Sequence, residues 1–303
     1  MIKLLQKVFG LSSTANNTVV QWPPTAEVDA QTRLSTEIPL YAAQECVFPF
    51  AVWAVSDRGV SRPDNQDSIF YLQAMMNTVD KSMPFGIFVV ADGLGGHEDG
   101  QIASRLATRA VAAHLIKTVY LPMLAGQSQD AASEPLNESL SRAVEVANRV
   151  VRENTDGGGS TLTALLLLDR TAYVAHIGDS RAYFVEKGAL YQITEDHSLG
   201  QRLMELEGLS AEDIVNLPER HTLYKALGQA TAPEPDIRYH HIAPGVHILL
   251  CSDGLWGFVT QQELSDAFQK NSAPREVCSH LANLAISHGS DDNISMIVLM
   301  SQT

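Results

Sequence analysis

The sequence predicts an α+β fold in which antiparallel sheets are covered by helices. Apolar runs of strand length follow one another in groups, separated by short polar turns. Stretches with an apolar residue at every third or fourth position, which are typical of amphipathic helices, come in pairs between those groups. No internal repeat of fixed period is visible.

The first group of strands is predicted at residues 51–55, 68–72 and 87–91. The third run, Ile87–Ala91, is apolar without alternation, which indicates a strand buried on both faces. It leads directly into Asp92 and a cluster of glycines. A carboxylate at the end of a buried strand is costly unless something neutralises it, and glycine lets the backbone come close to a ligand.

Two amphipathic helices are predicted after the glycine cluster. The helical spacing of the first is carried by Ile102, Leu106, Ala110, Ala113, Leu115 and Ile116. That of the second is carried by Leu136, Leu140, Val144, Ala147 and Val151. Proline, glycine and small polar residues between the two predict a loop at residues 118–135.

A meander of antiparallel strands is predicted next, at residues 161–168, 172–177, 182–185 and 190–193. One of its turns is Gly178-Asp179-Ser180. Residues 197–225 then combine a short helical pattern with a polar stretch.

The last part of the chain predicts a strand at 246–251, helices at 263–268 and 274–288, and a closing strand at 294–300. The strand at 246–251 leads into Asp253-Gly254, so the chain repeats the pattern seen at Asp92. A single Asp-Gly is best interpreted as a turn. The repetition favours a functional site.

Composition limits the kinds of partner. The 303 residues are 45% hydrophobic and 18% charged, as in a soluble globular protein. The net charge of −14, with no run of basic residues, argues against nucleic acid as a partner. No apolar stretch reaches the length of a membrane span. Three cysteines without paired or ligand-like spacing predict a reducing, cytoplasmic setting.

Residues 1–46 are expected to be a poorly structured N-terminal extension, and residues 47–303 the packed domain. The extension is rich in Ser, Thr, Asn, Gln and Pro after its first ten residues. Met1–Gly10 is compatible with a frayed terminus or with a short amphipathic docking turn, and it lacks the features of a signal peptide.

Acidic residues stand at several strand junctions, namely at Asp67, Asp92, Asp179, Asp253 and Asp292. Each one alone is more typical of a turn than of a ligand. If one sheet assembly brings them together, they repel strongly unless divalent cations lie between them. Oxygen ligands without His or Cys spacing favour Mg²⁺ or Mn²⁺ over zinc. The histidines at 97, 176, 197, 240, 241 and 247 show no metal spacing and are expected to be surface or core residues.

The motifs carry a family resemblance over residues 50 to 300. In order they are Ser56-Asp57-Arg58-Gly59, Arg62, Asn65-Gln66-Asp67, Ala91-Asp92-Gly93-Leu94-Gly95-Gly96-His97, Gly159-Ser160-Thr161, His176-Ile177-Gly178-Asp179-Ser180-Arg181, Ile193-Thr194-Glu195-Asp196-His197-Ser198, Leu250-Cys251-Ser252-Asp253-Gly254 and Asp292-Asn293. This set resembles the metal-dependent type-2C (PPM) serine/threonine protein phosphatases in their bacterial form. Each motif alone is weak, but their order is specific.

The resemblance implies a sandwich of two antiparallel β-sheets flanked by pairs of α-helices, with two Mn²⁺ or Mg²⁺ ions at one end. It implies that Asp92 bridges both ions and that the Gly93 carbonyl binds the first, with Asp67 acting through water. Asp253 and Asp292 would hold the second ion, and Asp179 with Asp253 a weaker third. Arg62 would bind the phosphate, although a residue beside a proline can also be an ordinary surface arginine.

Such a centre lowers the pKa of a shared water, which then attacks phosphorus in phosphoserine or phosphothreonine. Asp92, Asp253 and Arg62 are therefore the expected catalytic residues. Two positions depart from relatives of the family. Gln66 replaces a common Glu, which should soften metal affinity. Leu94 stands where the animal enzymes carry a histidine proposed as general acid. Residues 197–225 correspond to the family's variable flap, which either contacts substrate or packs as a surface excursion.

The resemblance further implies phosphorylated proteins and an opposing Ser/Thr kinase as partners, and the chain is expected to be a monomer. The alternative is a catalytically weak binding or scaffold module of the same fold. A phosphatase of the haloacid-dehalogenase type would need an Asp-x-Asp pair, which Asp92-Gly93-Leu94 lacks. A P-loop nucleotide hydrolase would need a Gly-Lys-Ser/Thr loop, which is absent from the sequence.

Overall fold

The computed structural model describes residues 48–77, 82–95, 98–126, 134–210, 213–214 and 217–302. The predicted extension, residues 1–46, and His97 lie outside the described residues. In the described part of the chain, no helix has the length and apolar character needed to cross a bilayer.

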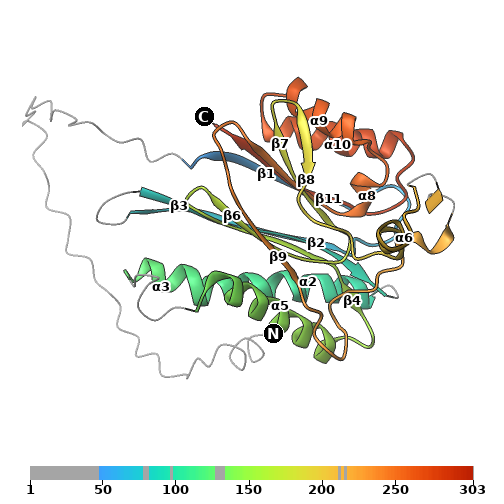
Figure 1. Cartoon of the computed structure of the whole chain (residues 1–303), viewed down its shortest axis with the longest axis horizontal. Coiled ribbons are helices and arrows are strands. Elements are labelled where there is room, and N and C mark those ends of the chain that lie inside the picture. Colours follow the sequence, from blue (N-terminus) through green and yellow to red (C-terminus); the bar gives the residue numbers. More distant parts are fainter. Residues whose placement is uncertain are drawn as a thin grey trace, which may run out of the picture. The chain divides into compact units, whose positions relative to one another are not determined.

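Two antiparallel sheets form the centre of the fold (Figure 1). The first has the order β1-β11-β10-β7-β8, with the bounds Phe50–Asp57, Ile294–Ser301, His247–Cys251, Arg181–Glu186 and Ala189–Gln192. The second has the order β2-β3-β5-β6-β9, with the bounds Asp67–Asn77, Ser82–Leu94, Leu162–Leu168, Thr171–Ile177 and Asp236–His241. The short strand β4, Gly159–Ser160, pairs with the end of β3.

Helices cover the outer faces of both sheets. On the second sheet lie α2 (Glu98–Leu115) and α5 (Leu136–Asn154), seen below it in Figure 1. On the first sheet lie α9 (Gln261–Lys270) and α10 (Pro274–Ser287). The predicted α+β sandwich flanked by helix pairs is confirmed.

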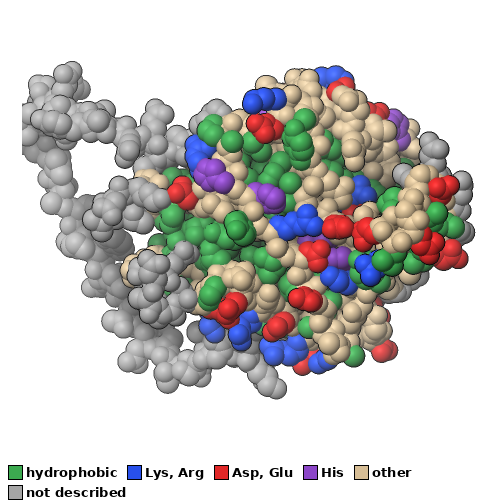
Figure 2. Space-filling view, viewed as in Figure 1, with side chains coloured by type: hydrophobic (Ala, Val, Ile, Leu, Met, Phe, Trp, Pro, Cys, Tyr) green, Lys and Arg blue, Asp and Glu red, His purple; other side chains and the backbone are tan. Residues whose placement is uncertain are grey.

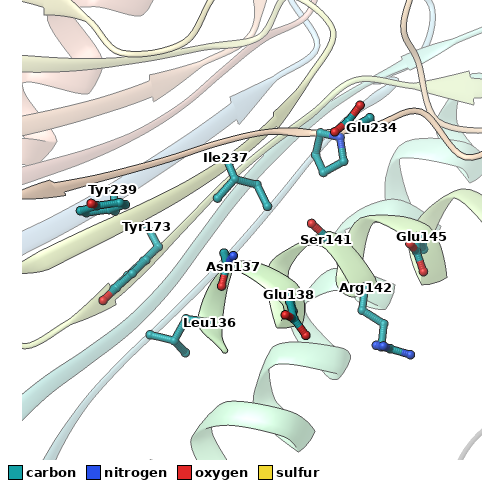
Figure 3. Close-up of a pocket in the computed structure, with 11 residues that line it drawn as sticks. Leu136, Asn137, Glu138, Ser141, Arg142, Glu145, Tyr173, Glu234, Ile237 and Tyr239 are labelled. Atoms are coloured by element: carbon teal, nitrogen blue, oxygen red, sulfur yellow. The ribbon is translucent and has the colours of Figure 1, made fainter. Parts of the chain in front are cut away.

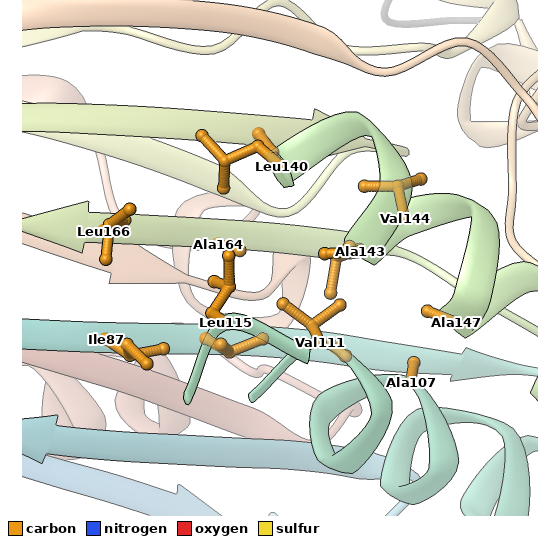
Figure 4. Close-up of a cluster of buried hydrophobic side chains, with 14 of the residues drawn as sticks. Ile87, Ala107, Val111, Leu115, Leu140, Ala143, Val144, Ala147, Ala164 and Leu166 are labelled. Atoms are coloured by element: carbon orange, nitrogen blue, oxygen red, sulfur yellow. The ribbon is translucent and has the colours of Figure 1, made fainter. Parts of the chain in front are cut away.

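Alternation along the buried strands builds three cores. On β3, Ile87 and Val89 pack under α2 and α5, whereas Phe88 and Val90 face the other sheet. Figure 4 shows the helix-side core, with Ile87 and Leu166 of the sheet beside residues of α2 and α5. On β11, Met296 and Val298 likewise pack under α9 and α10. The strands without polar alternation are therefore those covered on both faces, as predicted for residues 87–91.

The buried face of α2 agrees with the predicted one in part: Leu115 is buried, and Leu106, Ala110 and Ile116 pack against the same core while partly buried. Ile102 is 40% exposed, and the residues that face the sheet are Ala103, Ala107, Val111 and Leu115. Small residues form this face because α5 presents alanines to the same interface, including Ala143 and Ala147. A pattern of large apolar residues does not identify a face built from alanine.

The predicted loop at 118–135 is helical over its first part. A π-helical turn, Ile116–Tyr120, continues α2, and the short helix α3, Leu121–Leu124, follows it. Pro122 does not end the helix because it occupies the first turn of α3, where a missing N–H costs nothing. The second helix, α5, agrees with its prediction.

The predicted meander is interrupted at Gly178-Asp179-Ser180. Strand β6 pairs with β5 and β9, whereas β7 pairs with β10 and β8 in the other sheet. The segment between β6 and β7 therefore crosses from one sheet to the other. Strand β9 was not predicted, because its sequence, DIRYHH, lies at a sheet edge and is polar on one face.

Short elements complete the chain. The predicted short helix in the flap is α6, Leu199–Glu207, and a 3₁₀ turn covers Pro218–His221. The four-residue helix α8, Asp253–Trp256, follows β10 directly. In Figure 1, α8, α6 and β4 gather at one end of the sheets.

Candidate metal centre

The ends of β2 and β3 place the first two carboxylates side by side. Asp67 opens β2 and Asp92 lies near the end of β3, and the antiparallel register sets the two residues directly opposite each other. Asp67 is buried, with 6% of its surface exposed, and Asp92 is half-buried. Cross-strand partners of like charge destabilise a sheet. The register alone therefore shows that this position needs a compensating charge.

The other three carboxylates reach the same place from loops. Asp253 is the first residue of α8, directly after β10, and Asp292 precedes β11. Asp179 lies in the segment that crosses between the sheets and is 4% exposed. Burial is the main cause that raises the pKa of Asp92, and the negative charges of the other four carboxylates add to it. All five predicted acidic residues are thus brought together.

Burial and mutual repulsion shift the acidity of this cluster. Loss of contact with water is the main cause, and it raises the pKa of Asp67 to about 7 and that of Asp253 to about 6. The same cause raises the pKa of Asp92 and Asp179 well above the usual range, with the charge of neighbouring carboxylates adding to it. Buried carboxylates that repel one another are stabilised only by protons or by cations.

Two carboxylate oxygen atoms in the cluster lack the partner that a proton or a cation would provide. The Oδ1 atoms of Asp67 and Asp253 are buried and have no hydrogen-bond partner. Unpaired carboxylate oxygens suit a hard divalent cation. The donor set therefore fits Mg²⁺ or Mn²⁺.

As the side chains stand, no three His, Cys, Asp or Glu groups of the described residues take up the arrangement of a closed metal cage. One of the five carboxylates is paired with an arginine. Arg62 donates to Oδ2 of Asp292 at 2.6 Å. The arginine predicted to bind phosphate is half exposed and touches the cluster itself.

Asn293 holds the loop of Arg62 in place. Its side-chain amide donates to the carbonyls of Arg58 at 2.8 Å and Asp64 at 3.0 Å, and its Oδ1 accepts from the backbone N–H of Gln66 at 2.8 Å. One buried amide thus joins the loop between β1 and β2 to the residue after Asp292. This positioning role was not predicted.

Both Asp-Gly pairs need their glycine for close packing. A Cβ atom at Gly93 would collide with the carbonyl of Gly100 in α2, and one at Gly254 would collide with the carbonyl of Asn293. The backbone N–H of Gly93 donates to the carbonyl of Gln66 at 3.1 Å. Glycine at these positions lets two backbone segments touch beside the carboxylates.

Small hydroxyl groups hold the carboxylate-bearing segments. Ser252 donates to Oδ2 of Asp67 at 2.7 Å, and Thr161 Oγ1 accepts from the backbone N–H of Asp92 at 2.8 Å. Ser180 pairs with Thr161 at 2.7 Å. The sequence carried one signal for them, a polar residue directly beside a buried apolar strand.

The Asp179 segment is held by a partly buried cation, Arg181. Arg181 makes two-pronged contacts with Asp196, the shortest at 2.6 Å, and its guanidinium lies 3.4 Å from the ring centre of Trp256. The indole N–H of Trp256 donates to the carbonyl of Asp179 at 2.9 Å. Asp179 is therefore held from the flap side by an Arg-Trp-Asp unit.

Two of the predicted histidines pack against each other in the interior. His176 and His197 are buried and stacked, with ring centres 5.0 Å apart. Burial lowers the pKa of His176 to about 3, so this residue is neutral at physiological pH. Cys251 and Cys278 are buried free thiols, as the apolar surroundings of Cys251 predicted.

These observations define the class of protein first: a two-sheet α+β sandwich with an acidic centre suited to hard divalent cations at one end. The family model of protein phosphatase 2C matches residues 63–286. The chain belongs to the protein phosphatase 2C family.

Known relatives agree with this assignment. The serine/threonine phosphatase stp of Listeria innocua is 29% identical over 250 residues, which cover 80% of this chain and 93% of the relative. The serine/threonine protein phosphatase PstP of Mycobacterium tuberculosis is 32% identical over 251 residues, which cover 81% of this chain and 44% of the relative.

A solved structure of the catalytic domain of PstP, in complex with two manganese ions, superimposes with a TM-score of 0.65 at 30% identity. The match covers 83% of this chain and 97% of that domain.

Proposed function

We propose that this protein hydrolyses phosphoserine and phosphothreonine in proteins with the help of two Mn²⁺ or Mg²⁺ ions. The observation that carries the proposal is the cluster of five carboxylates with Arg62 at its rim. Membership in the protein phosphatase 2C family supports it, as does the pair of manganese ions in the PstP structure.

Different carboxylates of the cluster would hold different ions. Burial and the charges of the other four carboxylates raise the pKa of Asp92, which supports Asp92 as the residue that would contact both ions. The Gly93 carbonyl and, through water, Asp67 would complete the first site. Asp253 and Asp292 would complete the second, and Asp179 with Asp253 would form a weaker third.

When bound, the ions supply Lewis acidity that lowers the pKa of a water and offsets charge on phosphoryl oxygens. Arg62 orients the phosphate, because a planar guanidinium matches two phosphoryl oxygens at once. Its ion pair with Asp292 shows that the guanidinium reaches the carboxylate cluster. Leu94 offers no proton donor, so protonation of the leaving alcohol falls to water or to another group.

The wider setting is part of the same proposal. Phosphorylated proteins are the substrates, and a Ser/Thr kinase supplies them. The protein acts in the cytoplasm as a monomer. Gln66, in place of a glutamate, weakens the hold on the first ion by removing one negative charge.

Metal-dependent turnover tests the proposal. Hydrolysis of p-nitrophenyl phosphate and of a phosphothreonine peptide is measured with Mn²⁺, with Mg²⁺ and with EDTA. We expect turnover only with metal, and a loss of at least about 100-fold in Asp253→Asn, since even outer contacts of a metal ligand affect activity 10- to 100-fold. Calorimetric titration with Mn²⁺ should show weaker binding in the same variant.

Asp266→Asn is the matched control, because Asp266 lies on α9 and pairs only with exposed groups. It should retain the activity and the Mn²⁺ affinity of the parent protein. Folded protein that binds two ions but turns over neither substrate would instead support a binding or scaffold module of the same fold.

A further inference from the structure

A groove lies between α5 and the edge strand β9, on the outer face of the second sheet. Its volume is about 840 Å³, and it runs along the first half of α5. Figure 3 shows Asn137 and Ser141 of the helix on one side and Ile237 and Tyr239 of the strand on the other. None of the residues assigned to the metal centre lines this groove.

The floor and one wall of the groove are apolar and aromatic. Leu136, Tyr173 and Ile237 form the floor and are only partly buried by the core beneath them. The rings of Tyr173 and Tyr239 lie 6.2 Å apart, and Tyr239 is 74% exposed. In Figure 2, hydrophobic side chains gather on this face, above a band of charged groups. Exposed aromatic residues beside a groove are typical anchors of protein contacts.

The rim of the groove is acidic. Glu138, Glu145 and Glu234 line it, and none of them forms an ion pair with a described residue. Arg142 is the one basic residue among those that line the groove, and Glu134 holds it at 2.8 Å. The charge that would complement this rim is positive.

The strand beside the groove offers backbone groups as well. β9 pairs with β6 along its inner side and is the last strand of its sheet in the described part of the chain. An extended peptide can add to such an edge, with alternate side chains directed toward the neighbouring helix. Ile237 and Tyr239 alternate with Arg238 and His240 in this way, and His240 packs against Phe184 between the sheets.

The groove is linked to the metal centre through β6. Tyr173 lines the groove, and Asp179 follows it by six residues on the same chain segment. At about 3.3 Å per residue, the two positions are at most roughly 20 Å apart. A peptide in the groove could therefore continue into the catalytic end with a connection of about eight residues.

We propose that this groove docks a basic, extended segment of a protein substrate, in which Lys or Arg alternates with apolar residues. The segment lies remote from the phosphorylated residue and raises the effective concentration of that residue at the metal centre. The expected gain in turnover rests on the proposed phosphatase function, whereas the binding of the segment to the groove does not.

Three phosphothreonine peptides test the proposal on the full chain with Mn²⁺. All three share one phosphorylated core and a linker of about eight Gly and Ser residues, and they differ in the tail that follows. The first tail is Lys-Leu-Arg-Leu-Lys-Val-Arg, and the second has Glu at each basic position of that segment. The third tail contains only Gly and Ser. We expect the basic tail to raise kcat/KM about 10-fold through KM, with kcat unchanged. The unphosphorylated basic tail, carrying a fluorophore, should bind with an anisotropy change in the absence of turnover.

The variant Glu138→Lys/Glu145→Lys/Glu234→Lys, and separately Tyr239→Ser, should abolish the advantage of the basic tail and leave p-nitrophenyl phosphate turnover unchanged. Glu153→Lys is the matched control, since Glu153 is exposed on the same helix but does not line the groove.

Equal kcat/KM for the three peptides, or an equal loss in Glu153→Lys, would overturn the proposal. So would a dimer that Tyr239→Ser dissociates, because a second copy would then occupy the groove. Inactivity toward all substrates with intact tail binding would refute the proposed function and leave the docking groove standing.

Discussion

At the scale of single residues, the acidic end of the sandwich is unstable by itself. Asp67 lies opposite Asp92 on neighbouring strands, and its Oδ1 has no hydrogen-bond partner. Among the described residues, the Ser252 hydroxyl donates to Asp67, and the half-exposed Arg62 donates to Asp292. Buried anions that lack partners are kept in a fold only where a ligand compensates them.

Arg62 provides the sharpest test at this scale. Arg62→Ala should lower kcat/KM for a phosphothreonine peptide roughly 100-fold, as the removal of one donor to a developing oxyanion does elsewhere. Arg62→Lys should recover only part of that loss, because an ammonium cannot contact two phosphoryl oxygens in one plane. Steady-state kinetics measures both variants, and Mn²⁺ titration shows whether the metal sites persist. Full activity of Arg62→Ala would remove this residue from the phosphate site.

At the scale of elements, the register of strands and the packing of helices determine where the carboxylates lie. α2 begins beside the end of β3, and Gly93 allows the backbone of Gly100 to touch it. Behind this contact, α2 and α5 pack closely through alanines such as Ala107, Ala143 and Ala147. The position of the helix that supports the site therefore depends on small side chains.

Overpacking of the α2–α5 interface should destabilise the protein without touching the site. Ala147 is fully buried, so Ala147→Leu should cost about 1–3 kcal/mol in the free energy of unfolding. Arg149→Leu, on the exposed face of the same helix, should change it by no more than about 0.5 kcal/mol. Urea denaturation measures both variants. Equal stabilities would show that the interface has room for a larger side chain.

At the scale of the whole molecule, the carboxylate cluster couples stability to pH and to metal. The net charge is −14, so protons and divalent cations both bind against an acidic background. A metal that binds the folded state alone raises its stability according to its free concentration. The carboxylates come from the ends of strands in both sheets, so an ion held between them would connect the sheets.

The pH dependence in EDTA follows from the raised pKa of Asp67, about 7, and of Asp253, about 6. Both exceed the value of about 3.8 for an unfolded aspartate, so the folded state holds more protons between these limits. Stability should therefore fall as pH rises from 5 to 8, by at least on the order of 2 kcal/mol.

Denaturation in EDTA at pH 5 and pH 8 measures this change, and Mn²⁺ should restore stability at pH 8 far more than at pH 5, where protons compete for the same oxygens. The double variant Asp67→Asn/Asp253→Asn should show a flatter profile. A stability that rises from pH 5 to 8 in EDTA would show that the raised pKa of Asp67 and Asp253 does not govern the pH dependence.

The sequence by itself determined the residues of the candidate site and most of the elements. Apolar runs identify strands such as β3 and β11, because a strand covered on both faces has no polar alternation to confuse with a turn. Two Asp-Gly pairs at strand ends pointed to the carboxylates, and motif order pointed to the family. Each of these signals lies within a short stretch of residues, so it can be recognised without knowing the fold.

Only the tertiary structure decided which residues meet. It added Ala103, Ala107 and Val111 to the buried face of α2, placed β7 in the other sheet, and added β9 at an edge. It also showed that Asn293 holds the Arg62 loop and that Arg181 and Trp256 hold the Asp179 segment. These contacts join positions far apart in the chain, and their geometry depends on the packing of both sheets at once. No pattern within a window of residues contains that information.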